Sequence, residues 1–200
     1  TVDNGTTAVK QVAELMAAGI DVIISDHHEP GPTLPEPLAL LNPKWDGCGY
    51  PFRHLCGSGV AFQLLAGLAS RIPARGPQQD AMHDLLRHTI AFVAMATICD
   101  CVPLQGENRV LARAGVDAFA STNHPGLRAL VSQAGAARQV RADDISFRLG
   151  PRINAAGRLG HADRALALLL SSNVDEAAAI AAELDGKNVC RQDMEAAILN

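Results

Sequence analysis

Two short apolar runs near the start of the chain each end in polar residues. Residues 22–24 read Val-Ile-Ile and lead directly into Ser25-Asp26-His27-His28, while residues 38–41 end at Asn42-Pro43. Short runs of this kind are typical of buried strands in a parallel sheet. Thr1-Val2 is interpreted as the end of a further strand. In open α/β sheets ligands bind at the carboxyl ends of the strands, and these polar residues fall there.

A helix is predicted between the first two of these strands. Apolar side chains recur at helical spacing over residues 8–16, Thr6 or Thr7 can cap the start, and Gly19 is placed to end the helix. Strand, helix and strand then form a right-handed βαβ unit with parallel strands. Asp3 and the Asp-His-His triplet would consequently stand at the carboxyl ends of two strands.

The remainder of the chain is predicted to be mainly helical. Helical patterns of apolar residues cover residues 58–68, 82–98, 106–120, 126–134 and 162–170. A last helix begins at Asn173, with Glu176 as its capping-box partner, and is expected to be interrupted around Gly186. Because it carries many charges and few large apolar residues, it is interpreted as an exposed connecting helix. The whole pattern predicts an α/β fold in which helices flank a parallel sheet and further helical segments lead to this connecting helix.

Acidic residues end three of the apolar stretches. Asp3 follows Thr-Val, Asp26-His27-His28 follows the strand at 22–24, and Asp100 follows Ala-Thr-Ile-Cys. Carboxylates with imidazoles suit Mn²⁺ or Mg²⁺, and two such ions about 3.5–4 Å apart activate water and stabilise charge on a phosphoryl group. This set predicts phosphoester hydrolysis. Taken singly, the triplet also fits a solvated turn, and Asp100 also fits a helix-terminal hydrogen-bonding residue.

The composition is that of an ordinary globular chain. Its 200 residues, 48% apolar and 19% charged, can build one good-sized core, or one domain plus part of another. No apolar run approaches the ~18 residues that cross a bilayer, so no membrane contact is expected and the cytoplasm is the expected location. The five cysteines include no C-x-x-C pair, which argues against a disulfide framework and a structural zinc site.

Charge is unevenly distributed along the chain. The net charge is −4, but residues 138–164 hold six arginines against three aspartates, a local +3 that leaves −7 elsewhere. This segment fits either a phosphate-binding face or a solvated surface. Aromatic residues make up only 4% of the chain, which leaves little material for a platform on which bases stack.

Five motifs in this order and spacing resemble a known superfamily. Val2-Asp3-Asn4-Gly5, Ser25-Asp26-His27-His28 and the segment 97–104 resemble motifs II, III and IV of the DHH phosphoesterases. Gly106-Glu107-Asn108-Arg109 and the segment 152–158, which reads Arg-Ile-Asn-Ala-Ala-Gly-Arg, resemble the RecJ branch of single-strand-specific 5′ to 3′ exonucleases. The resemblance covers nearly the whole chain. It implies digestion of single-stranded DNA in recombination and repair, two Mn²⁺ or Mg²⁺ ions, and recombination or replication proteins as further partners.

The resemblance also implies roles for individual residues. Asp3 would bridge the two metal ions, and His27 and Asp100 would bind one of them. His28 would contact the scissile phosphate. Asp26 would not bind metal itself but would orient a histidine.

The DNA backbone would be held by Arg152, Asn154 and Arg158. Residues 1–171 would form the DHH catalytic domain without its amino-terminal motif I portion, and residues 172–200 would begin an interdomain connecting helix. Because the Asp-x-Asp of motif I, which supplies further metal ligands, has no counterpart, the fragment is expected to bind metal weakly and to be inactive alone. Two other hypotheses remain: a DHH phosphodiesterase for short oligonucleotides or cyclic dinucleotides, and a DHH interaction module without catalysis.

Overall fold

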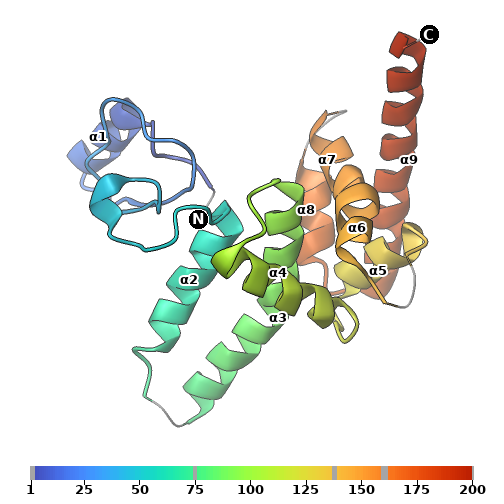
Figure 1. Cartoon of the computed structure of the whole chain (residues 1–200), viewed down its shortest axis with the longest axis horizontal. Coiled ribbons are helices and arrows are strands. Elements are labelled where there is room, and N and C mark those ends of the chain that lie inside the picture. The colour runs from blue at the N-terminus through green and yellow to red at the C-terminus, as the bar shows by residue number, and fades with distance from the viewer. Residues whose placement is uncertain (1–2, 74–75, 137–138, 159–161, 200) are drawn as a thin grey trace. The chain divides into compact units, whose positions relative to one another are not determined.

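The computed structural model describes residues 3–73, 76–136, 139–158 and 162–199, without the side chains of Arg158 and Leu199. The chain divides into two compact units, Thr1–Gly115 and Val116–Asn200, which are described separately (Figure 1). Within the residues that the structure describes, no helix is both long enough and apolar enough to cross a bilayer.

The first unit contains a small parallel sheet. After α1 (Val9–Ala17), strand β1 (Ile23–Ser25) pairs in parallel with β2 (Ala39–Leu41). The N–H of Asp26 donates to the carbonyl of Leu41, which carries the pairing one residue beyond β1. The predicted parallel sheet is therefore confirmed, and the Asp-His-His triplet leaves the sheet at its carboxyl end. The predicted strand end at Thr1-Val2 lies outside the described residues.

The start of α1 differs from the prediction, whereas its end agrees. The residue at the N-cap is Ala8, and no side chain caps the helix. Thr6 does not cap the helix but is fully buried, where its N–H donates to Asp26 and its hydroxyl accepts from Asn42. At the other end Gly19 has φ +77°, the left-handed conformation that favours glycine after a helix.

Three helices complete the first unit. Helices α2 (Gly57–Ala69) and α3 (Pro77–Cys99) pack against each other, and α4 (Gly106–Phe119) begins in this unit. The segment between β2 and α2 contains a short 3₁₀ turn, η1 (Asp46–Cys48). A buried apolar cluster joins this segment to all three helices; it contains Leu55, Val60, Val93 and Leu111. The cluster fixes the carboxyl end of α3, where Asp100 follows.

The second unit is helical. It contains α5 (Pro125–Gln133), α6 (Ala142–Asp144), the π-helical turn η2 (Ile145–Leu149), α7 (Gly150–Arg158), α8 (Asp163–Leu170) and α9 (Val174–Leu199). Helix α9 packs against α5, α7 and α8. Its buried positions lie within its first fifteen residues, at Ala177, Ile180, Ala181, Leu184 and Asn188.

Helix α9 confirms Asn173 as its N-cap, but the predicted capping box with Glu176 is wrong, because the N–H of Asn173 donates to the hydroxyl of Ser171 and Glu176 accepts from that hydroxyl. The side-chain oxygen of Asn173 accepts the N–H groups of Asp175 and Glu176, as an N-cap residue does.

The predicted interruption of α9 is also wrong. The helix then runs without a break through Gly186, because buried residues on either side hold it against the core. The pair Lys187–Glu183, one turn apart at 3.0 Å, also supports the helix there.

The two halves of α9 should respond differently to truncation. Ile180 is 1% exposed and Ile198 is 83% exposed. We expect Ile180→Ala to lower the free energy of unfolding by about 2–5 kcal/mol, because it leaves a cavity in the core. Ile198→Ala, the matched control, should change it by less than about 0.5 kcal/mol. Urea unfolding followed by circular dichroism measures both, and equal effects would contradict the division of α9 into a packed and an exposed half.

Candidate metal centre

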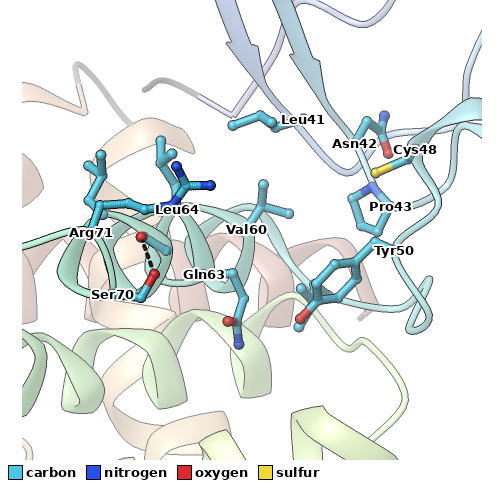
Figure 2. Close-up of a pocket in the computed structure, with 13 residues that line it drawn as sticks. Leu41, Asn42, Pro43, Cys48, Tyr50, Val60, Gln63, Leu64, Ser70 and Arg71 are labelled. Atoms are coloured by element: carbon cyan, nitrogen blue, oxygen red, sulfur yellow. Dashed lines mark hydrogen bonds between the residues drawn. The ribbon is translucent and has the colours of Figure 1, made fainter.

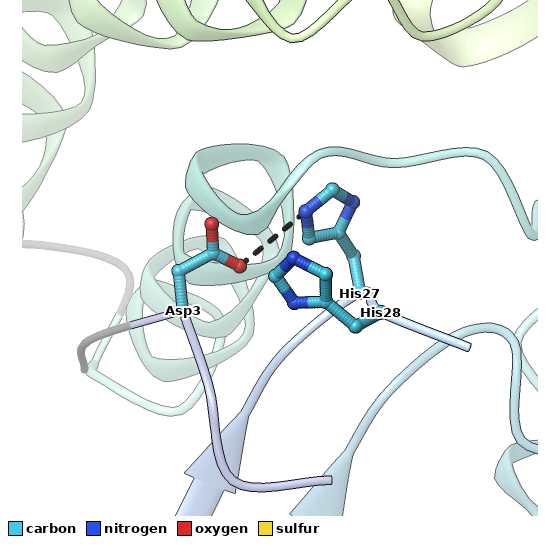
Figure 3. Close-up of side chains that lie close together, drawn as sticks. All are labelled: Asp3, His27 and His28. Carbon is cyan, nitrogen blue, oxygen red and sulfur yellow. Dashed lines mark ion pairs between the residues drawn. The ribbon is translucent and has the colours of Figure 1, made fainter. Parts of the chain in front are cut away.

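The imidazole of His27 lies between two carboxylates that come from different elements. Its Nε2 atom is 3.6 Å from Oδ1 of Asp3 and 3.5 Å from Oδ2 of Asp100. His27 is buried, whereas both carboxylates are partly exposed. Figure 3 shows the side chains of Asp3, His27 and His28 gathered together. The structure thus brings together Asp3, His27 and Asp100, three predicted site residues that stand far apart in the sequence.

These distances suit ligands of one cation. Two ligand atoms that are each about 2.1–2.2 Å from the same ion stand about 3.0–3.6 Å apart. The donor atoms of Asp3, His27 and His28 all lie within 4.8 Å of one another. Carboxylate oxygens with imidazole nitrogens suit Mn²⁺ or Mg²⁺. The residues present therefore fit a divalent ion beside His27, where the donor atoms of Asp3, His27 and His28 lie close together and Asp100 adds a further carboxylate 3.5 Å from His27.

Asp100 stands where a helix does not favour an acid. It is the C-cap residue of α3, and the partial negative charge at a helix C-terminus disfavours a carboxylate. The next residue, Cys101, has φ +56°, a conformation that is uncommon for residues other than glycine. Neither feature stabilises the helix, whereas a cation at His27 would offset the negative charge.

Asp26 is buried behind the two histidines and accepts four hydrogen bonds. Its oxygens accept the backbone N–H groups of Thr6, His27 and His28 at 3.0, 2.8 and 3.2 Å. The fourth partner is Nδ1 of His28 at 2.7 Å. Burial alone would raise the pKa of Asp26, but the hydrogen bonds from Thr6 and His28 hold it well below its usual range. Asp26 is therefore an anion at neutral pH.

His28 is oriented by this anion. The hydrogen bond to Asp26 raises the pKa of His28 above its ordinary value, although partial burial opposes the shift. Because Nδ1 faces Asp26, Nε2 is the nitrogen left to face the centre. The ring itself is largely exposed. Such a histidine can present an N–H to an anionic oxygen of a substrate.

Sequence reasoning missed Asn42, which holds the same loop from the other side. Asn42 is fully buried and its Nδ2 donates to the hydroxyl of Thr6 at 2.8 Å and to the backbone carbonyl of His28 at 2.9 Å. It directly follows strand β2, so the signal that singled out Asp26, a polar residue at a strand end, was also present here.

Gly57 was also missed, and the sequence gives no signal for it. A Cβ atom on this first residue of α2 would lie 2.0 Å from Oδ1 of Asp3, so the carboxylate rests directly against the glycine. Asp3 itself has φ +52°. The absence of a side chain at Gly57 therefore permits the position of Asp3 beside His27. Only the fold brings these two residues together.

The residues predicted to hold DNA belong to the second unit. Arg152 is bound to Asp185, with Nε and Nη2 at 2.8 and 2.7 Å from the same carboxylate oxygen. Asn154 is exposed on α7, and the side chain of Arg158 lies outside the described residues. Arg164 pairs with Glu183. The patch is therefore less positive than its sequence implied, because acids of α9 neutralise two of its arginines.

A cavity of about 510 Å³ lies elsewhere in the first unit (Figure 2). Its wall is mainly aliphatic and includes Leu41 and Asn42. The hydroxyl of Tyr50 donates to Glu107 at its edge, and burial together with this carboxylate raises the pKa of Tyr50 to about 12. The described residues that line this cavity include no acid and no imidazole, so they offer no ligand set comparable with that around His27.

Comparison with known proteins identifies the class. The model of the DHH family, N-terminal domain, matches residues 1–97. Together with the Asp-His-His centre at the end of a parallel strand, this match identifies residues 1–97 as an N-terminal domain of the DHH family.

Within that class the chain is similar to the single-stranded-DNA-specific exonuclease RecJ. It is 42% identical to RecJ of Bacillus subtilis over 195 residues, 97% of this chain and 23% of the relative. It is 39% identical to RecJ of Escherichia coli over 199 residues, 98% of this chain and 34% of the relative. The chain thus spans about a quarter to a third of the length of these relatives.

Solved structures of RecJ share the fold. A crystal structure of exonuclease RecJ bound to manganese matches the whole chain with a TM-score of 0.84 at 37% identity, and the match covers 48% of that chain. RecJ from Thermus thermophilus in complex with Mn²⁺ gives the same TM-score and identity, with 28% of that chain covered. The predicted fold class, a parallel sheet with flanking helices followed by further helical segments, is confirmed, and the sheet described here has two strands.

The contact between Gly57 and Asp3 predicts a loss of metal affinity. We expect Gly57→Ala to weaken Mn²⁺ binding about 10–100-fold, since the methyl group displaces the Asp3 carboxylate. Gly67→Ala, in the same helix but with open space around the glycine, should leave Mn²⁺ binding unchanged. Isothermal titration with MnCl₂ measures both variants, and equal affinity would contradict a ligand role for Asp3.

Proposed function

We propose that the complete gene product is a metal-dependent exonuclease that digests single-stranded DNA from 5′ to 3′ in recombination and repair. The observation that carries this proposal is the convergence of Asp3 and Asp100 on Nε2 of His27, at 3.6 and 3.5 Å, in a DHH-family chain similar to RecJ. Mn²⁺ or Mg²⁺ is the proposed cofactor, because the donor set fits these ions and the related RecJ structures contain them.

The proposed mechanism assigns a task to each residue of the centre. Asp3 would serve both metal ions, and His27 and Asp100 would hold one of them. When bound, the ions supply an activated water and neutralise charge on the phosphate. His28 donates from Nε2 to a phosphate oxygen, while Asp26 keeps the proton on Nδ1 and fixes the ring.

Further residues act on the DNA and on the chain's organisation. The DNA backbone would be contacted by Arg152, Asn154 and Arg158. To do so, the guanidinium of Arg152 would either break its ion pair with Asp185 or bind Asp185 and a phosphate at the same time. We further propose that residues 1–171 form the catalytic domain and that residues 172–200 begin a connecting helix. The cytoplasm, and recombination or replication proteins as partners, follow from the same proposal.

Digestion of DNA by the complete gene product tests the function. We expect Mn²⁺-dependent release of labelled mononucleotide from 5′-labelled single-stranded DNA, and a loss of at least about 100-fold in His27→Ala because a metal ligand is removed. His88→Ala, an exposed histidine of α3, is the matched control and should retain full activity. Wild-type protein that binds Mn²⁺ but leaves the DNA intact would overturn the exonuclease and favour a phosphodiesterase for short substrates.

The 200-residue chain alone should show little activity. Among the described residues the centre offers Asp3, His27, His28 and Asp100, whereas each Mn²⁺ or Mg²⁺ takes about six ligands. We therefore expect weak Mn²⁺ binding and digestion at less than about 1% of the rate of the complete gene product. Parallel assays at equal concentration check this, and comparable rates would show that the chain's own ligands suffice.

A further inference from the structure

One aromatic ring of the second unit faces solvent. Phe147 is 77% exposed, whereas every other Phe, Tyr and Trp side chain among the described residues is buried or half-buried. It lies in the π-helical turn η2, between the fully buried Ile145 and Leu149. These two anchors fix the backbone of the turn, so the ring is held outward by the fold. Turns of this type occur frequently at functional sites.

The surroundings of Phe147 are polar. Exposed Arg148 follows it directly, and the guanidinium of Arg148 is held in place by Asp144 and by the carbonyl of Gly135. Asn154 is exposed one element later on α7. With about 85° per residue in the π turn and about 100° in the α-helix, Phe147 and Asn154 lie within about 50° of each other around the axis. One helical face therefore presents a ring and an amide.

We propose that Phe147 is a base-stacking residue for single-stranded nucleic acid, a role that rests on the proposed exonuclease function and adds a specific contact to it. Proteins that bind single strands combine polar contacts to the backbone with aromatic rings on which bases stack. Unpaired bases expose the flat faces that such a ring needs. Phe147 supplies the ring, while Arg148 and Asn154 supply polar groups beside it.

The chemistry of the surface favours a nucleobase over a protein partner. Docking sites for proteins are contiguous apolar patches, whereas the helical neighbours of Phe147 one turn earlier are the acids Asp143 and Asp144, and exposed Arg148 follows it. A single ring among polar groups matches the size of one base. Because stacking tolerates any base, the proposal assigns Phe147 to affinity for the strand and not to sequence preference.

The test compares Phe147→Leu with Phe147→Trp in the complete gene product. Binding of fluorescein-labelled (dT)20 is measured with Ca²⁺ in place of Mn²⁺, and digestion is measured with Mn²⁺. We expect Phe147→Leu to raise both Kd and KM about tenfold with little change in kcat, and Phe147→Trp to restore them. Leu170→Ala, an exposed apolar residue of α8, is the control and should behave as wild type.

A 20-mer of abasic nucleotides separates stacking from a structural role. It keeps the phosphates and lacks the bases, so wild type and Phe147→Leu should bind it equally if the ring stacks on a base. A tenfold penalty that persists on this strand, or Phe147→Leu binding (dT)20 within twofold of wild type, would overturn the proposal while digestion by wild type leaves the exonuclease intact. Wild-type protein that neither binds nor digests single strands would overturn both.

Discussion

The buried carboxylate of Asp26 is the constraint on which the centre depends. Removing a charge from water costs several kcal/mol unless donors replace the water, and here three backbone N–H groups and one imidazole do so. These donors come from Thr6, His27 and His28, so a single anion fixes the start of α1 and the loop after β1 relative to each other. The directions of both histidines follow from that arrangement.

The other parts of the site come from elements whose positions are set by the packing of the fold. Strand β1 ends at the triplet, α3 ends at Asp100 because its last turns pack in the apolar core, and α2 begins at Gly57 beneath Asp3. No single segment holds enough ligand atoms for an ion. Precision therefore comes from rigid packing of separate elements, which loops alone would not provide.

Much of this was accessible from the sequence because it depends on local patterns. Apolar runs in the sequence located strands β1 and β2. Asp3, His27 and Asp100 were located because each follows an apolar stretch. What failed depends on contacts between distant segments. Thr6 does not cap α1, because its N–H donates to Asp26. Arg152 is paired with Asp185, an acid 33 residues away. Close approach of a backbone to a carboxylate, as beneath Asp3, leaves no trace in periodicity or composition.

The continuity of α9 has a mechanical consequence. Its 26 residues form a rod about 39 Å long, and its first half is embedded among α5, α7 and α8. A break at Gly186 would have acted as a joint that absorbs force applied to the exposed half. Because α9 has no such break, a force on its carboxyl-terminal end is transmitted along the helix as torque on the core of the second unit. The helix therefore acts as a stiff connection and not as a flexible one.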